Sequence, residues 1–189
     1  MQLTIHRYWC GPDRAPLPWL AQYLRHVHGL GEVEVVDWTD HKLPGELLRL
    51  CDTADRLVVS SDRWRHRANI VRWWLLREHG GIWLDHDVVP LSRVDQLAER
   101  WTAAARNYRV TCALGFPKGD PLPIRMLARL DVFLEAMNPP MHSATVVGSR
   151  ALDDLVDPGV EAINLLVDGH GDLVNARSPL LHLWAHHGL

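Results

Sequence analysis

Apolar residues recur every three or four positions between residues 64 and 75, which is the spacing of one face of a helix. The series consists of Trp64, Ala68, Val71 and Leu75. Ser61 precedes it, and a serine hydroxyl can accept a hydrogen bond from an otherwise unpaired backbone N–H in the first turn of a helix. The pattern therefore predicts a capped helix that begins just after Ser61.

Two glycines, Gly80 and Gly81, follow this predicted helix. Glycine tolerates the left-handed backbone that closes a helix, so the chain can turn at once into a new element. The next residues, 82–84, form an apolar run short enough to lie as a strand inside a sheet. Asp85 and Asp87 come directly after that run, on either side of a histidine, at the predicted carboxyl end of the strand.

The rest of the chain alternates between strand and helix patterns. A strand at residues 3–9, a helix at 19–28 and a strand at 33–38 give a βαβ opening. Such alternation predicts an α/β fold with a mixed, mostly parallel sheet flanked by helices. The further expectations are helices at 44–50, 93–105, 124–137, 151–156 and 160–167, strands at 110–116 and 143–148, a loop at 118–123, and a strand or extended segment at 56–59.

The two aspartates are candidate ligands for a divalent cation. Carboxylates one residue apart at the end of a strand can converge on a hard ion such as Mg²⁺ or Mn²⁺, which keeps open positions for phosphate oxygens. Open α/β sheets bind ligands at this edge. An Asp-x-Asp pattern by itself also occurs in ordinary solvated turns, so the neighbouring residues have to decide between these interpretations.

Those neighbours resemble the DXD-motif sugar transferase family, which includes Golgi mannosyltransferases and large bacterial glucosylating toxins. The resemblance is carried by residues 67–72, 75–76, 80–87 and 90–91, an ordered set of helix arginines, double glycine, aromatic residue and paired aspartates. It implies a GT-A-like, Rossmann-like fold, with residues 1–189 forming a single minimal glycosyltransferase domain. It also implies metal-dependent transfer of a sugar, with retention, from a UDP- or GDP-sugar to an acceptor hydroxyl.

The resemblance also implies roles for individual residues in binding the sugar donor. Trp9 would stack on the nucleotide base, Asn69 and Arg72 would contact the sugar hydroxyls, and Trp83 would lie near the ribose. Asn69 stands where the family commonly has an aspartate, so the identity of the sugar stays open. A buried core position is the alternative for Trp9 and suits Trp83 equally well, and Arg72 suits a structural ion pair or a contact with the donor phosphates.

The implied catalytic residues are Arg72, Asp85 and Asp87, and the implied cofactor is Mn²⁺ or Mg²⁺. Asp85 would bind the ribose or reach the metal through water, whereas Asp87 would ligate the metal directly. His182 lies in a segment similar to the one that closes the active site in this family, and a neutral imidazole can join two carboxylates around manganese. A surface histidine is the alternative there. No general base can be named.

Composition narrows the classes of protein that remain. The chain has 189 residues, a net charge of −3 and a pI near 6.4, which disfavours a duplex-wrapping nucleic-acid binder, although modified DNA stays open as an acceptor. The 3 cysteines form no C-x-x-C pair, so neither a disulfide framework nor a zinc site is indicated. With no signal peptide and no membrane span expected, the protein is predicted to be cytoplasmic.

Three other classes of protein remain compatible with these residues. A metal-dependent nucleotide-sugar hydrolase would use the same aspartates without needing an acceptor. A non-catalytic nucleotide-sugar binder would bind the donor and break no bond. A structural or interaction domain with an accidental motif would bind no such ligand at all.

Overall fold

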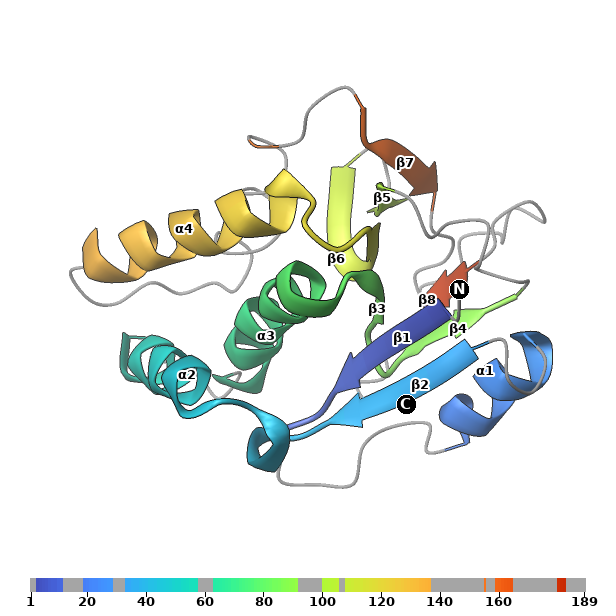
Figure 1. The fold of residues 1–189 in the computed structure, drawn as a ribbon, viewed down its shortest axis with the longest axis horizontal. Coiled ribbons are helices and arrows are strands. Elements are labelled where there is room, and N and C mark those ends of the chain that lie inside the picture. The colour runs from blue at the N-terminus through green and yellow to red at the C-terminus, as the bar shows by residue number, and fades with distance from the viewer. Residues whose placement is uncertain are drawn as a thin grey trace.

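The computed structural model describes residues 3–11, 19–28, 33–57, 63–91, 100–105, 108–136, 155, 159–164 and 180–182. Strands alternate with helices up to residue 84, as the sequence predicts (Figure 1). In chain order they are β1 (Leu3–Tyr8), α1 (Leu20–His28), β2 (Val33–Trp38), the 3₁₀ helix η1 (Asp40–Lys42), α2 (Gly45–Leu57), α3 (Arg63–His79), β3 (Gly81–Leu84), β4 (Val88–Pro90), β5 (Trp101–Ala105), β6 (Tyr108–Phe116), α4 (Pro121–Ala136), β7 (Glu161–Asn164) and β8 (Leu180–His182).

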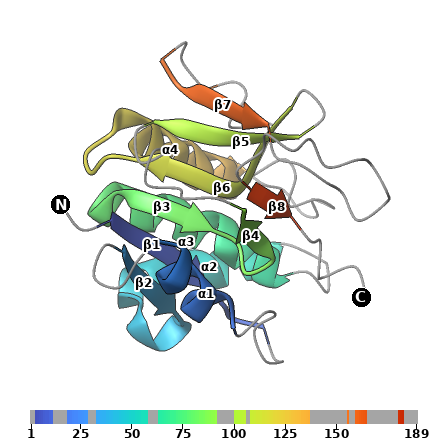
Figure 2. The same cartoon turned by 90° about the vertical axis from the view of Figure 1, so that its right-hand side faces the viewer.

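A six-stranded sheet in the order β2-β1-β3-β6-β5-β7 forms the centre of the described fold (Figure 2). β1 pairs in parallel with both β2 and β3, and β5 pairs in parallel with β7. β6 pairs antiparallel with β3 and β5, so within this sheet it alone runs against the others. A separate two-stranded sheet joins β4 to β8. The predicted mixed, mostly parallel sheet flanked by helices is confirmed.

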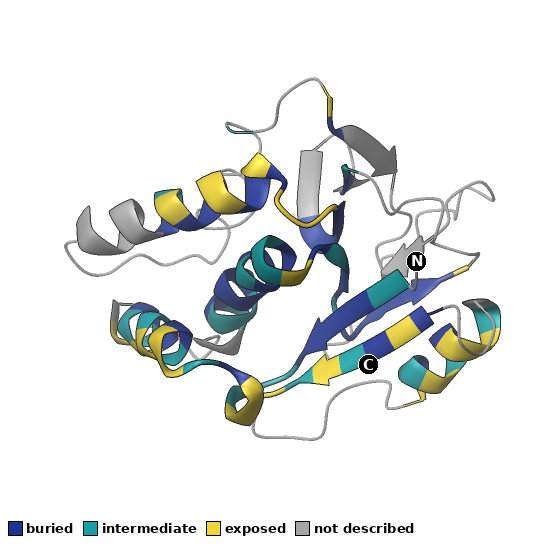
Figure 3. Ribbon diagram, in the orientation of Figure 1, coloured by how far each residue is buried: buried dark blue, intermediate teal, exposed yellow. Residues whose placement is uncertain are grey.

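Two hydrophobic clusters pack against the sheet, one on each face. One face is covered by α2, α3 and α4, and the other by α1 (Figure 1). Strand alternation sends neighbouring residues to opposite clusters: Trp83 packs with α3 and α4, whereas Ile82 and Leu84 pack with Leu20 and Leu24 of α1. Buried residues follow β1 and the inner side of α3 in Figure 3. The fold is thus a three-layer α/β arrangement around one sheet.

The double glycine ends α3 and starts β3 as predicted, for reasons of both backbone and space. Gly80 and Gly81 have φ of +68° and +91°, a region that side-chain-bearing residues rarely adopt. A Cβ on Gly80 would lie 2.3 Å from the backbone nitrogen of Lys118, and one on Gly81 would lie 2.5 Å from the carbonyl oxygen of Thr4. Only glycine fits both positions, which fixes where β3 enters the sheet.

Three expectations about secondary structure are wrong. Residues 101–105 and 161–164, expected in helices, form β5 and β7, and residues 56–57, expected to be extended, belong to α2. The alanines of β5 favour a helix locally, but pairing with β6 on one side and β7 on the other overrides that preference. α2 continues to Leu57 because Leu47, Cys51 and Ala54 are buried at helical spacing.

Helix α4 also begins earlier than expected, inside the predicted loop at 118–123. Asp120 caps it by accepting a hydrogen bond of 2.8 Å from the backbone N–H of Leu122. Pro121 occupies the first helical position, where its missing N–H costs nothing. The expected strand at 143–148 and the helix cap at Ser61 lie outside the described residues.

Candidate active site

The carboxyl ends of β1 and β3 form the point where the strand order reverses. The chain passes from β1 to β2 on one side, and β3 then lies against the other side of β1. In open α/β sheets, ligands bind in the crevice outside such a switch point. Trp9 follows β1 there, and Asp85, His86 and Asp87 follow β3. The topology therefore brings the predicted base-binding and metal-binding segments to the same edge of the sheet.

The two aspartates lie in a tight turn between β3 and β4. The backbone N–H of Asp85 donates to the carbonyl of Cys112 at 2.8 Å, and the N–H of Val88 donates to the carbonyl of Asp85 at 3.1 Å. Asp87 is 6% exposed, and 26% of the Asp85 side chain is exposed. The backbone of β6 and the closed turn thus fix the backbone that carries both aspartates relative to the sheet.

Arg72 and Trp83 bind Asp85 from the α3 side of the sheet. The Trp83 indole N–H donates to Oδ1 of Asp85 at 2.7 Å, and Arg72 Nη2 lies 3.3 Å from the same oxygen. The Arg72 guanidinium lies over the Trp83 ring, 5.1 Å from its centre, and also donates to the carbonyls of Ala68 and Thr111. Arg72 therefore forms the structural ion pair that the sequence left open, directly beneath one of the predicted ligands.

The other predicted donor residues on this side are buried. Trp83 is 1% exposed and belongs to the core cluster of the helical face, which matches the core interpretation of this residue. Asn69 is 7% exposed and stands one turn before Arg72 on α3. Contacts of Asn69, Arg72 and Trp83 with a sugar donor stay predictions.

Trp9 lies against the aspartate turn although 77 positions separate it from His86. The two rings meet edge to face, with centres 5.7 Å apart. The backbone N–H of Trp9 donates to the carbonyl of Trp38, and a Cβ on Gly11 would lie 2.6 Å from the Trp9 ring, so the chain folds closely over the indole. The ring is half-buried, and its stacking on a nucleotide base stays a prediction.

Arg7 is a residue of this region that the sequence analysis did not single out. It is 2% exposed, and its Nη2 donates to Nδ1 of His86 at 2.6 Å. Arg7 has the same parity along β1 as Ile5, so strand alternation directs it toward the buried α1 face. A charged residue at an apolar strand position was the available signal, but its partner could not be found without the fold.

His6 links β1 by a hydrogen bond to Gly80, the residue just before β3. Its Nδ1 accepts from the Trp38 indole N–H at 3.1 Å, so its Nε2 carries the proton and donates to the carbonyl of Gly80 at 3.0 Å. Burial of the ring lowers the pKa of His6 from 6.5 to about 4, more than its bond to Gly80 raises it, and nearby His79 lowers it further. His6 is therefore neutral at pH 7.

The donor set at the turn fits a hard divalent cation, because Asp85 and Asp87 supply carboxylate oxygens. Among the side chains that the structure describes, no group of three histidines, cysteines or acids suited to a metal is found. The side chain of His182 lies outside that set, but its backbone does not. β8 pairs antiparallel with β4 so that His182 stands opposite Val88, the residue after Asp87. The third predicted ligand thus belongs to a strand adjacent to the turn.

A second cluster of carboxylates lies near the same edge, around Arg67 of α3. Arg67 makes ion pairs with Asp40 at 3.0 Å, Asp55 at 2.7 Å and Asp52. Burial opposes its charge, but the hydrogen bond and charge of Asp55, with the charge of Asp40, outweigh this and raise the pKa of Arg67. The Tyr8 hydroxyl donates to Asp40 at 2.5 Å and so joins β1 to this cluster.

Cys10, Cys51 and Cys112 form no disulfide in the part of the chain that the structure describes. Burial raises the pKa of Cys10 to about 11 and that of Cys51 to about 12. Both thiols are therefore protonated at neutral pH, and the protonated form is a poor nucleophile.

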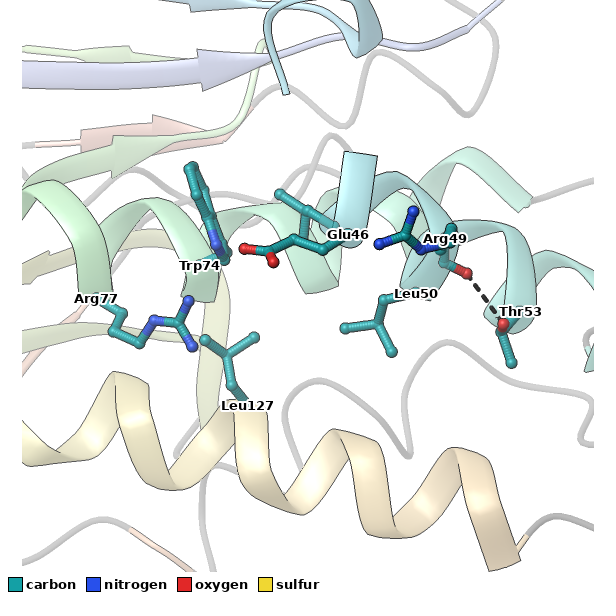
Figure 4. Close-up of a pocket in the computed structure, with 8 residues that line it drawn as sticks. Glu46, Arg49, Leu50, Thr53, Trp74, Arg77 and Leu127 are labelled. Atoms are coloured by element: carbon teal, nitrogen blue, oxygen red, sulfur yellow. Dashed lines mark hydrogen bonds between the residues drawn. The ribbon is translucent and has the colours of Figure 1, made fainter. Parts of the chain in front are cut away.

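A groove of about 400 Å³ lies on the helical face, between α2, α3 and α4. Glu46 and Arg49 of α2, Trp74 and Arg77 of α3, and Leu127 of α4 line it (Figure 4). The groove contains none of the residues predicted for the donor or the metal. It is separate from the aspartate turn.

No protein-family model matches the sequence, and no curated protein sequence matches it. Among solved structures, the chain is similar to one named PaToxG Glycosyltransferase, with a TM-score of 0.57 and 11% identity. The match covers 82% of this chain and 68% of that one. The chain therefore shares the fold of that protein. At such low identity the likeness concerns the fold alone, so the site must be argued from its own residues.

No helix among the described residues is both long enough and apolar enough to cross a membrane.

Proposed function

We propose that this chain is a metal-dependent glycosyltransferase that moves a sugar from a UDP- or GDP-sugar to an acceptor hydroxyl, with retention of configuration. One observation carries the proposal. Trp9 and the turn that holds Asp85 and Asp87 meet at the switch point of the sheet, joined by the ring contact between Trp9 and His86. A nucleotide diphosphate needs a flat surface for its base and a cation for its phosphates; the Trp9 indole would supply the first, and Asp85 and Asp87 would bind the second.

Asp87 and Asp85 would hold Mn²⁺ or Mg²⁺, with His182 as the candidate third ligand. When bound, the metal supplies positive charge that stabilises the departing diphosphate. Arg72 keeps Asp85 in place through its 3.3 Å ion pair, and the Trp83 N–H holds the same oxygen. Trp9 would stack on the base, an interaction worth about 1–3 kcal/mol. The chain's own residues thus divide the task into base binding, metal binding and orientation of the metal ligand.

A thermal-shift panel tests donor binding directly. UDP, GDP and their common sugar conjugates are added with and without Mn²⁺, and a ligand that binds the folded state raises the melting temperature. We expect stabilisation by one nucleotide series that grows when Mn²⁺ is present. Failure of both series in the presence of the metal would contradict the proposal.

A turnover assay then separates transfer from its alternatives. Release of UDP or GDP that requires an added acceptor identifies a transferase. Release of the free sugar at full rate without an acceptor would indicate a nucleotide-sugar hydrolase instead, and saturable binding with no bond cleavage would indicate a non-catalytic binder. Polysaccharides, proteins, small molecules and modified DNA form the acceptor panel.

A further inference from the structure

Arg7 is a buried cation placed directly behind the aspartate turn. It is 2% exposed, and its described hydrogen bond goes to Nδ1 of His86. Its Nε lies 3.4 Å from Oδ1 of Asp37, close enough for an ion pair but without hydrogen-bond geometry, and Asp37 is 49% exposed. Among the described residues, Nη1 has no hydrogen-bond acceptor. Burial lowers the pKa of Arg7, and the charge of Asp37 opposes that only in part.

Stability alone does not account for such a group. Removing a guanidinium from water costs several kcal/mol of free energy, and the attraction of a single partly exposed carboxylate offsets little of that cost. Proteins with apolar residues of similar volume at such positions are often as stable or more stable. The informative feature is therefore the one strong bond that Arg7 makes, which ends on the residue between the two predicted metal ligands.

That bond fixes the imidazole of His86. Arginine can only donate, so Nδ1 of His86 must be the acceptor, which determines the tautomer and the orientation of the ring. The same ring also meets the Trp9 ring edge to face. Fixing the imidazole therefore affects both the turn and the indole.

We propose that Arg7 is a positioning residue that couples Trp9 to the carboxylates of Asp85 and Asp87 through His86. The inference rests on the proposed function, since it takes Trp9 to bind the base and the aspartates to bind the metal. Removing a residue that orients a metal ligand typically lowers the affinity for the metal about 10–100-fold. Arg7 should therefore affect two ligands that it does not touch.

The experiment measures the affinity of the whole chain for Mn²⁺ alone, and for uridine or guanosine alone, by calorimetric titration. Arg7→Met should weaken Mn²⁺ binding about tenfold or more and should also weaken the nucleoside. Arg7→Gln keeps an N–H donor toward His86 and should retain most of both affinities, which a purely electrostatic role would not allow. Arg25→Met is the matched control, because Arg25 lies on the same face, exposed, and bonds only the Val35 carbonyl among described contacts.

The outcomes separate this inference from the proposed function. Binding of Mn²⁺ and nucleoside by the wild-type chain, with unchanged affinities in Arg7→Met, overturns the inference and leaves the proposed function standing. Failure of the wild-type chain to bind either ligand overturns both. Equal losses in Arg7→Met and Arg25→Met would likewise overturn the positioning role, because they would show a general effect of charge.

If Arg7→Met does not fold, variants of His86 test the same coupling between Trp9 and the aspartates. His86→Asn places an acceptor oxygen near the position of Nδ1 but removes the ring, so it should keep Mn²⁺ affinity and lose nucleoside affinity. His86→Leu removes both and should lose both affinities. A His86→Leu variant that binds both ligands like the wild-type chain would refute the coupling.

Discussion

Two groups of carboxylates lie near the carboxyl edge of the sheet, and they are built differently. Around Arg67, three aspartates accept hydrogen bonds from one guanidinium. The side chains of Asp40 and Asp52 remain 40% and 56% exposed. At the Asp85–Asp87 turn, the arginines are almost fully buried and bond mostly to other groups, Arg72 to backbone carbonyls and Arg7 to an imidazole. In the first group the acids all bind one cation of the protein itself, which offsets only part of their charge, whereas the second group holds its acids at the switch point with buried side chains behind them.

β1 supports both groups, which makes the contrast testable. Tyr8 bonds to Asp40 of the Arg67 cluster, and its neighbour Arg7 bonds to His86 of the turn. Strand alternation sends these two side chains to opposite faces of the sheet. A change on one face can therefore be compared with a matched change on the other.

The largest expected effect is on activity. Asp87→Asn keeps the shape of the side chain but removes the charge that a metal needs, so turnover should fall about a hundredfold or more, and Mn²⁺ should no longer raise the melting temperature. Asp52→Asn removes one partner of Arg67 and should leave turnover unchanged. Nucleotide release and thermal shift measure both variants, and an equal loss in the two would abolish the distinction between the clusters.

The next largest expected effect is a loss of stability when the glycine at the start of β3 is changed. Gly81→Ala forces a Cβ to within 2.5 Å of the Thr4 carbonyl at a φ of +91°, and we expect a loss of about 3 kcal/mol in unfolding free energy. Gly119→Ala is the control, since Gly119 has a φ of +85° but open space around it, and it should lose only about 1 kcal/mol. Urea unfolding gives both values. Equal losses would mean that backbone angle alone, and not the close approach to β1, determines the cost.

Acid should weaken the attachment of β1 to β3 through His6. The folded pKa of about 4 lies below the unfolded value of 6.5, so the unfolded chain takes up the proton first as the pH falls. The stability that neutral His6 contributes is complete above pH 6.5 and should decline by about 3 kcal/mol by pH 4. Urea unfolding of the wild-type chain and His6→Gln across this range measures the difference, and parallel pH curves would contradict the assignment.

The smallest effect concerns the Arg67 cluster. Arg67→Met leaves Asp55, whose side chain is 15% exposed, without its cation, and should cost about 2 kcal/mol of unfolding free energy. Asp52→Asn should cost below about 1 kcal/mol because its side chain is largely in water. Neither change should alter Mn²⁺ binding. A metal affinity that falls in Arg67→Met would show that the two clusters are coupled.

Local sequence signals predicted the elements that surround the site. The spacing of apolar residues in α3, the glycine pair, the short apolar strand and the aspartates after it all lie within one continuous stretch. Their order reflects short-range physics, namely helical periodicity, the backbone freedom of glycine and strand burial. The same signals misassigned residues 101–105 and 161–164, because the alternative to a helix there was pairing with strands distant in the sequence.

By itself, therefore, the sequence determined the short strand that Asp85 and Asp87 follow and the α/β class of the fold. Only the tertiary structure decided which side chains stand behind that strand. The Arg7–His86 bond spans 79 positions and the Trp9–His86 contact 77, and no local periodicity encodes such pairs. Whether a buried arginine meets an acid, a carbonyl or an imidazole depends on the register of strands that neighbour each other in space, which exists only once the sheet has formed.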